Sequence, residues 1–584
     1  MITKEDISSF FDIEAEASRK LWEALMSLSL KERIRKRKAI GNLTLDKNYS
    51  DRSPEGENLI RVTVKTNLSD FKEGDCLILH KEGNVHGIEC TLYQFECDNS
   101  IVLSVFPLNM PSKLDDYYDE ELVLDKNLVD LRSNVYDNFL ASVPYDHEFW
   151  EKLLINDLHS PTFEKVEECE AELDDTIKNF ELNLMPNQRE AILNSMTAKD
   201  YYLIQGPPGT GKSFVLGLVM LEELVYFKHK IIVIGPNHLA INNALGQVLK
   251  MWPAMSGCII KVGQSYNAPK MTVENKGEEK QITNCLRLPN VHLINNLDGG
   301  WIIGLTPHSL YSSRGRGLEC DTLVIDEAGQ MTISLALMGM VKAKKVILAG
   351  DHKQLAPIIT SEKMMEYMKK SIFQKLMQNG NFTLLDVSFR MCKPICDFVS
   401  DLFYEGKVKA KNTDCGNRIL CGNELLDFRH PVIIHHVDDE GEQTSKKEAE
   451  FIVKAIKSFL NLGLMANEIG VLSPFRAQAA LIRRLIRKDS EIKDEDELQV
   501  AVDTIDKMQG QEREVIIVTL VAGKSDYIKD MADFLYNPNK LNVAFSRAKS
   551  KLIIVGNINK IREIDQLEYP HIYKMLKSKY VEYM

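Results

Sequence analysis

The sequence lacks a long hydrophobic run, since no stretch approaches the ~20 consecutive apolar residues that span a bilayer. Its start, MITKEDISSFFDIEAEA, does not join a basic segment to an apolar one as a signal peptide does. Its 11 cysteines form no C-x-x-C pair, and its histidines form no cluster of zinc-finger spacing. We therefore expect a cytoplasmic protein, with the nucleus as the alternative location, that has reduced thiols, no zinc finger and no membrane partner.

The chain also has fewer basic than acidic residues. The chain has 72 Lys and Arg against 84 Asp and Glu, a formal net charge of −12. No overall positive field attracts polyanions, so a nucleic-acid contact would need a local basic track. Hydrophobic residues make up 44% and charged residues 27% of the 584 positions, which is typical of folded globular proteins. At ~150 residues per domain, this length predicts roughly four domains.

The first 181 residues predict a helical stalk and a small β-barrel. Residues 6–40 repeat apolar side chains at helical spacing. Residues 42–108 change to short runs such as LIRVTV and CLILH, separated by Asn, Asp, Gly and Ser, which is typical of strands. Residues 112–180 are acidic and fit a helical connection. We assign residues 1–181 to one accessory domain.

The remainder of the chain has an α/β pattern. Buried strands are expected at YYLIQ, KIIVIG, CIIKV, WIIGLT, TLVID and KVILAG, and a second series runs from TLLDVS near residue 383 to KLIIVGN. Continuous apolar strands separated by helices predict mostly parallel sheets. We predict two tandem doubly wound domains over 182–372 and 373–584, with a short insertion near 264–285.

A phosphate-binding loop follows the first of these strands. The segment fits G-x-x-x-x-G-K-[ST] between the strand YYLIQ and a helix-compatible run. Glycines let backbone N–H groups approach phosphate oxygens, and the following helix directs its positive end at the same anion. We expect the lysine to bind the β- and γ-phosphates and the serine to bind magnesium. The loop comprises Gly206, Pro207, Pro208, Gly209, Thr210, Gly211, Lys212 and Ser213.

Acidic and amide side chains follow two later strands. Asp326 and Glu327 come directly after TLVI, and Gln354 follows KVILAG. The carboxyl ends of parallel strands border the ligand crevice of such a sheet. Asp326 is therefore a candidate for the magnesium shell, Glu327 for the base that activates water, and Gln354 for a sensor of the γ-phosphate.

Other nucleotide-hydrolysing classes lack support. No N-K-x-D element follows the phosphate loop, which disfavours guanosine, and no LSGGQ-like signature indicates an ABC-type ATPase. Phosphoryl transfer needs positive charge at the γ-phosphate, and an arginine from across a cleft supplies it in many ATPases. We expect the second α/β domain to supply that arginine.

Four segments of the second domain carry a family resemblance. They are SFRMCKPICDFVSDLFYEGKV, SPFRAQAALIRRL, VDTIDKMQGQEREVIIVTL and LNVAFSRAKSKLIIVGN. Together with GPPGTGKS, DEAGQ and GDHKQLAP, they resemble superfamily 1B helicases, in particular the branch of the nonsense-mediated-decay, senataxin and immunoglobulin-mu-binding helicases. The resemblance covers about residues 182–560 and implies two RecA-like domains.

The resemblance also implies roles for residues of the nucleotide site. Arg390 and Arg547 would approach the γ-phosphate from the second domain. Gln188 would read the adenine edge, which makes ATP the expected nucleotide. Phe389 would stack on adenine, and Glu512 would hold the ribose.

Nucleic-acid contacts are implied along the top of both domains. Such contacts grip phosphate and sugar, so little sequence preference is expected. The alternative is that Thr or Asn at a strand end only caps a helix. The implied residues are Pro236, Asn237, Thr306, Pro474, Phe475 and Thr504.

The sequence therefore predicts an ATP- and magnesium-dependent motor on single-stranded nucleic acid, and the family resemblance implies that it moves 5′ to 3′. The alternative is an ATP-gated clamp or remodelling subunit that holds nucleic acid without separating strands. The choice between DNA and RNA stays open because no single residue reads the 2′-hydroxyl. A protein partner such as a nuclease is possible but unidentified.

Overall fold

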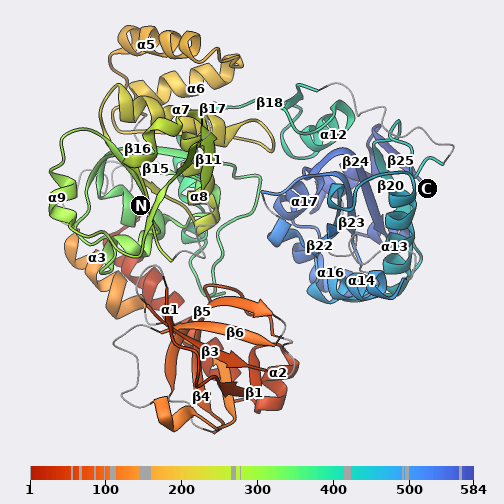
Figure 1. Cartoon of the computed structure of the whole chain (residues 1–584). Helices are drawn as coiled ribbons and strands as arrows, with labels where there is room; N and C mark the ends of the chain where they lie inside the picture. Colours follow the sequence, from red (N-terminus) through yellow and green to blue (C-terminus); the bar gives the residue numbers. More distant parts are fainter. Residues whose placement is uncertain are drawn as a thin grey trace.

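The computed structural model describes the chain in three parts (Figure 1). The described residues are all except 1, 54–56, 65–66, 68, 84–86, 98, 106–113, 130, 144–159, 265–270, 276–277, 413–422, 490–491, 493–498, 509, 522 and 565–567. We call the part built on an eight-stranded sheet the first lobe and the part built on a six-stranded sheet the second lobe. The barrel is the closed sheet near the N-terminus.

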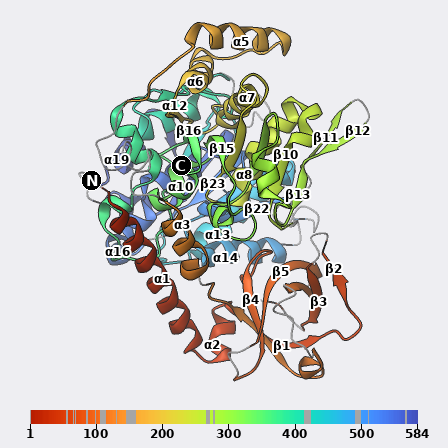
Figure 2. The ribbon, with the colours of Figure 1, turned by 90° about the vertical axis from the view of Figure 1, so that its left-hand side faces the viewer.

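A long N-terminal helix joins the barrel to the first lobe. Helix α1 (Lys4–Met26) begins with a capping box in which Thr3 and Asp6 satisfy each other's backbone N–H groups. Near its start, Phe11 stacks on Tyr136 with ring centroids 3.9 Å apart. The helix runs from the first lobe toward α2 (Leu30–Arg35) and the barrel (Figure 2). This is the expected stalk.

The barrel is closed by six strands. The hydrogen-bonded order is β1-β7-β4-β5-β6-β3, and β1 also pairs with β3, which completes the circle; β2 (Asp51–Arg52) extends β3 at the edge. Alternate residues of these strands fill one apolar interior. The predicted small β-barrel is confirmed. The strands are β1 (Ala39–Leu45), β3 (Asn58–Thr63), β4 (Cys76–Lys81), β5 (Ile88–Cys97), β6 (Ser100–Val105) and β7 (Leu122–Lys126).

The first lobe is a parallel sheet in the order β13-β10-β14-β9-β15-β16-β8-β17. Along β8, Tyr201 and Leu203 pack under α10 and α11, whereas Tyr202 and Ile204 pack under α6, α7 and α8. Both faces are buried, which explains the apolar strands of the sequence. The strands are β8 (Tyr201–Gln205), β9 (Lys230–Ile234), β10 (Ile259–Val262), β13 (Thr283–Cys285), β14 (Trp301–Gly304), β15 (Cys320–Ile325), β16 (Ala343–Gly350) and β17 (Thr383–Leu384).

Helices and one hairpin complete the first lobe. In the predicted insertion, β11 (Thr272–Asn275) and β12 (Glu278–Gln281) form an antiparallel hairpin, and part of this insertion lies outside the described residues. The helices are α5 (Val166–Asn179), α6 (Pro186–Thr197), α7 (Lys212–Val225), α8 (His238–Met251), α9 (Val291–Asn295), α10 (Ile333–Met340) and α11 (Ile372–Leu376).

The second lobe is a parallel sheet in the order β22-β21-β23-β24-β20-β25. Helices α12, α16, α17 and α19 cover one face, and α13 and α14 cover the other. Its strands are β20 (Val432–His436), β21 (Ile469–Ser473), β22 (Ala501–Thr504), β23 (Arg513–Thr519), β24 (Ala548–Gly556) and β25 (Val581–Tyr583). Its helices are α12 (Lys393–Phe403), α13 (Lys446–Asn461), α14 (Arg476–Lys488), α16 (Ser525–Leu535), α17 (Pro538–Phe545), α18 (Ile558–Ile561) and α19 (Pro570–Lys577).

The predicted fold class, two tandem α/β domains with a stalk and a barrel, is confirmed. The domain boundaries stay predictions. One strand assignment was wrong, because Thr383–Leu384 of TLLDVS pairs with β8 of the first sheet. The thiol prediction fails at Cys392, which is disulfide-bonded. Seven described cysteines, Cys76, Cys90, Cys169, Cys258, Cys285, Cys320 and Cys396, are free. Among the described residues, no helix is both long and apolar enough to cross a membrane.

Candidate functional site

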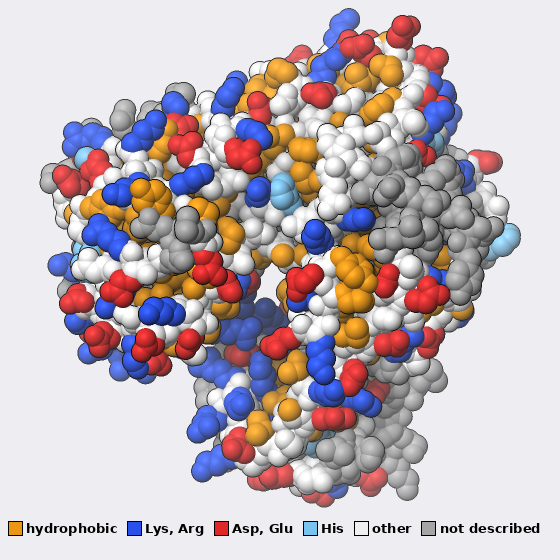
Figure 3. All heavy atoms as spheres, turned by 180° about the vertical axis from the view of Figure 1, so that it is seen from behind, with side chains coloured by type: hydrophobic (Ala, Val, Ile, Leu, Met, Phe, Trp, Pro, Cys, Tyr) orange, Lys and Arg blue, Asp and Glu red, His pale blue; other side chains and the backbone are white. Residues whose placement is uncertain are grey.

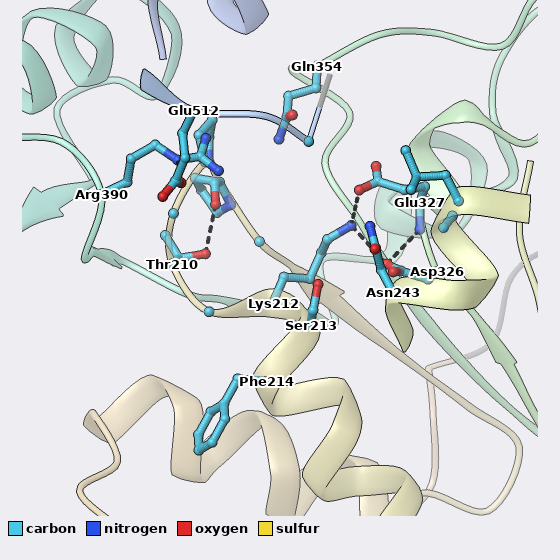
Figure 4. A pocket seen from close by; sticks show the side chains of 18 of the residues that line it. Thr210, Lys212, Ser213, Phe214, Asn243, Asp326, Glu327, Gln354, Arg390 and Glu512 are labelled. Atoms are coloured by element: carbon cyan, nitrogen blue, oxygen red, sulfur yellow. Dashed lines mark hydrogen bonds and ion pairs between the residues drawn. The ribbon is translucent and has the colours of Figure 1, made fainter. Parts of the chain in front are cut away.

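A cavity of about 490 Å³ lies between the two lobes, at the carboxyl ends of β8, β15 and β16 (Figure 4). The first lobe contributes the phosphate loop and the side chains after β15 and β16, and the second lobe contributes residues near β18 (Val387–Ser388), β23 and β24. Among its lining residues are Lys212, Ser213, Asp326, Glu327, Gln330, Gln354, Phe389, Arg390, Glu512 and Arg547. Residues predicted from distant parts of the sequence therefore meet at one place.

The phosphate loop needs its glycines for two separate reasons. Gly209 and Gly211 have φ of 74° and 82°, a left-handed conformation that other residues rarely adopt. A Cβ atom on Gly209 would also lie 2.4 Å from Cβ of Arg390, because the second-lobe segment passes directly over the loop. The N–H of Phe389 donates to the Gly209 carbonyl at 2.8 Å. The loop therefore already contacts the segment that carries Arg390.

Lys212 lies between two carboxylates (Figure 4). Its Nζ is 2.9 Å from Oδ1 of Asp326 and 2.7 Å from Oε1 of Glu327. Burial alone would lower the pKa of Lys212, but the two carboxylates raise it above its ordinary value. Burial raises the pKa of Asp326, whereas Lys212 and Gln330 offset burial and hold the pKa of Glu327 below its usual range. Glu327 is thus an ionised carboxylate at neutral pH.

The backbone fixes where Glu327 points. Its φ of 55° is left-handed, which is uncommon for a residue with a side chain and costs about 1–3 kcal/mol. Gln330 Nε2 donates to Glu327 Oε2 at 3.0 Å. Gln330 belongs to the DEAGQ segment but was not assigned a role from the sequence. Its position one 3-10 turn after Glu327 was the signal that could have identified it.

Each predicted arginine is held by an acceptor in the cavity. Arg390 Nε lies 2.6 Å from Oε2 of Glu512, and Lys549 Nζ lies 2.9 Å from the other oxygen of the same carboxylate. Arg547 is 2% exposed and donates from Nη2 to Oε1 of Gln354 at 3.3 Å, a bond that crosses between the lobes. Burial and the charge of Arg390 lower the pKa of Arg547 to about 9, so it stays charged at neutral pH.

A buried network next to Gln354 also joins the lobes. Asp351 accepts from Gln354 Nε2 at 2.9 Å and from the Tyr404 hydroxyl at 2.6 Å. The Tyr404 oxygen in turn accepts from Asn542 Nδ2 at 2.7 Å. Sequence reasoning missed Asp351, Tyr404 and Asn542, because their partners lie 53 to 138 residues away along the chain. Tyr404 stands in the segment SFRMCKPICDFVSDLFYEGKV, in which only Phe389 and Arg390 were assigned roles.

The two residues expected at the adenine lie in different environments. Phe389 is 45% exposed and lines the cavity. Gln188 is buried and is not among the lining residues. Its Nε2 donates to the Thr210 carbonyl at 3.1 Å, and its Oε1 accepts from the N–H of Met185 at 3.0 Å. Both roles at the base stay predictions.

The residues expected to contact nucleic acid lie mostly outside this cavity. Asn237 follows β9 and caps α8 by accepting from the N–H of Ala240 at 3.0 Å, and Thr306 follows β14 and caps a 3-10 turn. Phe475 is 9% exposed and stacks on Phe534 with centroids 5.4 Å apart. Pro236, Pro474 and Thr504 also stand at carboxyl ends of strands. Capping thus accounts for Asn237 and Thr306 structurally, and their contact with nucleic acid stays a prediction.

Comparisons with known proteins agree with this geometry. Two family models, both described as AAA domains, match the chain. One matches residues 183–287 and 279–362, and the other matches residues 368–559. An ATP-dependent helicase of Methanocaldococcus jannaschii is 26% identical over 68% of this chain and 71% of its own. DNA polymerase alpha-associated DNA helicase A of Schizosaccharomyces pombe is 28% identical over 66% of this chain and 65% of its own.

Two further matches are more limited. The mouse DNA replication ATP-dependent helicase/nuclease DNA2 is 25% identical over 79% of this chain, and the match spans only 43% of that protein. A crystal structure of an arterivirus nonstructural protein 10 helicase covers 88% of this chain and 78% of its own, with 12% identity and a TM-score of 0.38.

Two RecA-like lobes with a phosphate loop, paired acidic residues and arginines facing one cavity define a P-loop ATPase of the helicase class. With the AAA-domain and helicase matches, the chain belongs to superfamily 1, in the branch indicated by its sequence. The predicted family and enzyme class are confirmed.

Proposed function

We propose that this protein is a 5′-to-3′ translocase on single-stranded nucleic acid that hydrolyses ATP between its lobes. One observation carries the proposal: Lys212 and Glu327 of the first lobe and Arg390 and Arg547 of the second line the same cavity. Charge that develops on a transferred phosphoryl group is then met from both sides. The direction of movement rests on the family resemblance.

The side chains of this cavity fit a magnesium ion. Mg²⁺ prefers oxygen ligands, and the hydroxyl of Ser213 and the carboxylate of Asp326 both border the cavity. Asp326 is 2% exposed, and Lys212 contacts only one of its oxygens. When bound, the ion would neutralise phosphate charge. Ser213 and Asp326 are the residues that would hold it.

The proposed cycle exchanges ion pairs. Lys212 would leave the carboxylates for the β- and γ-phosphates, which frees Glu327 to orient and deprotonate the attacking water. Arg390 would leave Glu512 for the γ-phosphate, while Arg547 turns from Gln354 toward the same group. Because these partners belong to both lobes, hydrolysis would change how the lobes bind each other and could drive a ratchet.

A local basic track supports nucleic acid as the partner despite the net negative charge. Figure 3 shows Lys and Arg side chains gathered around the hollow between the second lobe and the barrel. Arg476 of α14 lies 3.2 Å from Asp70 of the barrel, and Arg37 and Lys38 lie 3.9 Å from the same carboxylate. Three cations for one carboxylate leave a local positive surplus. Phosphates of a passing strand would interact favourably with it.

The test combines ATPase and unwinding assays on the full chain. We expect single-stranded oligonucleotide to stimulate ATP hydrolysis, and a duplex with a 5′ overhang to be separated faster than one with a 3′ overhang. Stimulated hydrolysis without strand separation would support the clamp instead. Hydrolysis that oligonucleotide does not stimulate would reject the motor. Running DNA and RNA in parallel at stated salt identifies the substrate class.

A further inference from the structure

Glu424, His430 and Glu582 bring three metal-binding side chains together on the second lobe. Each offers one ligand atom, and these atoms all lie within 4.8 Å of one another. Glu424 and His430 stand in the segment before β20, and Glu582 stands in β25, the edge strand that pairs with β20. Figure 1 shows both strands on the side of the second lobe away from the first lobe. The residues that line the nucleotide cavity do not include these three, so the cluster is separate from the proposed ATPase site.

A buried lysine fixes the segment that carries two of the three side chains. Lys551 of β24 is fully buried. Its Nζ donates to the carbonyls of Glu424, Asp427 and His430 at 3.1, 2.7 and 2.7 Å. The backbone from 424 to 430 is therefore wrapped around one ammonium group. Because the ligands of a metal site must be held close to their bound positions, a backbone fixed in this way favours binding here.

Strand register places the third side chain. In the parallel pairing of β20 with β25, Glu582 lies opposite Ile433, just after His430 in the chain. β25 has three residues and lies at the edge of the sheet, so a single neighbouring strand holds it. Short edge strands open easily because few hydrogen bonds hold them. An ion bound by both His430 and Glu582 would fasten β25 to the lobe.

The geometry between His430 and Glu582 is not that of a hydrogen bond. Nδ1 of His430 lies 2.7 Å from Oε1 of Glu582, yet this buried nitrogen makes no hydrogen bond among the described residues. The ring nitrogen therefore points past the oxygen. Atoms bound to one ion at about 2.0–2.2 Å stand roughly 3–4 Å apart and point at the ion rather than at each other. Small rotations of the three side chains would produce that arrangement.

The charges of the cluster favour a cation. Among the residues that the structure describes, no Lys or Arg forms an ion pair with Glu424 or Glu582. Arg429, which lies between the ligands in the chain, pairs with Asp427 instead. Two carboxylates so close together repel each other, and a divalent ion would neutralise both.

We propose that Glu424, His430 and Glu582 bind one Zn²⁺ ion that fastens β25 to the segment before β20. An imidazole nitrogen together with carboxylate oxygens suits Zn²⁺, whereas Mg²⁺ and Ca²⁺ prefer oxygen ligands alone. Three protein ligands leave a fourth position for water, and the Glu582 side chain is 46% exposed, so solvent reaches that position. The ion would stabilise the second lobe and take no part in ATP hydrolysis. The ligands come from distant segments, so their spacing in the sequence could not reveal them.

The first test is a zinc titration of the full chain in excess Mg²⁺, followed with a zinc-binding dye as competitor. The Mg²⁺ competes for the oxygen ligands of the nucleotide cavity. Loss of an outer hydrogen-bond partner already weakens metal binding about 10–100-fold, so we expect H430A and E582Q each to weaken zinc binding at least about tenfold. H292A and E450Q, which alter an exposed histidine of α9 and an exposed glutamate of α13, should bind zinc as the wild type does. Unchanged zinc binding in H430A and E582Q would overturn the proposal, as would a wild-type protein that binds no zinc.

Amide hydrogen exchange tests what the ion does. In the wild-type protein, zinc at about a hundred times its Kd should slow exchange in β25 by up to about 100-fold, because the strand must release the ion before it opens. With a chelator present, H430A and E582Q should exchange near the wild-type rate, and added zinc should not slow them. This comparison separates loss of the ion from loss of the fold. If zinc slows exchange equally in H430A and the wild type, or in neither, no ion joins β25 to His430.

Discussion

The ammonium of Lys212 lies 2.7 Å from Oε1 of Glu327, so the cation expected to bind phosphate also neutralises the carboxylate expected to activate water. Asp326 shares the same ammonium at 2.9 Å. A triphosphate and Mg²⁺ together would supply replacement charge to all three groups. Under the proposed mechanism, this arrangement would keep Glu327 paired until ATP and Mg²⁺ bind.

Substitutions of these two residues should separate binding from chemistry. E327Q removes the base but keeps the shape, so we expect ATP binding within about threefold of wild type and turnover lower by about 10²–10⁴. K212A removes the phosphate contact and leaves two buried carboxylates unpaired, so binding and turnover should both be lost. Nucleotide titration and steady-state ATPase measure these effects, with K250A on the exposed end of α8 as the control. Normal turnover in E327Q would remove Glu327 from the mechanism.

Conservative replacement of the arginines tests their charge geometry. A lysine in place of Arg547 keeps the positive charge but loses the planar guanidinium that reaches Gln354. A lysine in place of Arg390 likewise loses the guanidinium that contacts Glu512. We expect R390K and R547K to bind ATP while single-turnover hydrolysis falls by about 10²–10⁴. R513K, which changes a partly exposed arginine on β23, is the matched control. Wild-type rates in both variants would place the needed charge elsewhere.

Tyr404 provides a test of the link between the lobes. Y404F removes the hydroxyl that donates to Asp351 at 2.6 Å, which leaves a buried carboxylate with one donor fewer. We expect a loss of about 1–3 kcal/mol in unfolding free energy. Basal ATPase should also fall, because Asp351 holds Gln354.

Tyr536 supplies the control for this change. It is equally buried, and its hydroxyl has no hydrogen-bond partner among the described residues, so Y536F should be nearly neutral. Urea unfolding and ATPase rates are measured on both variants. Equal stability of Y404F and Y536F would show that the Asp351 bond contributes little.

The sequence predicted those parts of the site that are local along the chain. Gly206 to Ser213 are consecutive residues between β8 and the first turn of α7, and Asp326 and Glu327 directly follow β15, so strand and helix patterns were enough to place them. Pairs that form only on folding escaped prediction. The Arg390–Glu512 bond spans 122 residues, and the Asp351–Tyr404 bond depends on how two lobes meet.

The fold follows the same rule: individual strands could be predicted from neighbouring residues, but the pairing of strands that are distant in the sequence could not. Alternating residues predicted the barrel strands, but the β1–β3 pairing that closes the barrel depends on strand order. TLLDVS was apolar enough for a strand, and nothing local indicated that Thr383 would join the first sheet. Gln188 matched its motif, yet its amide is occupied by Thr210 and Met185. Hydrogen-bond competition of this kind is decided by tertiary packing.

Glu448 predicts how the stability of the second lobe depends on pH. This carboxyl of α13 is 1% exposed; burial raises its pKa from 4.5 to about 7, with Asp439 adding to the shift. Because the folded pKa lies above the unfolded one, the stability it contributes is complete below about pH 4.5 and is lost as pH rises through about 7.

E448Q keeps an acceptor for the N–H of Val521 and cannot ionise. We therefore expect E448Q to gain up to about 3 kcal/mol over wild type between pH 5 and 8. Thermal unfolding across that range measures it, and E450Q, on the exposed side of the same helix, should show no pH-dependent difference. A stability difference between E448Q and wild type that does not change with pH would mean that Glu448 titrates in its ordinary range.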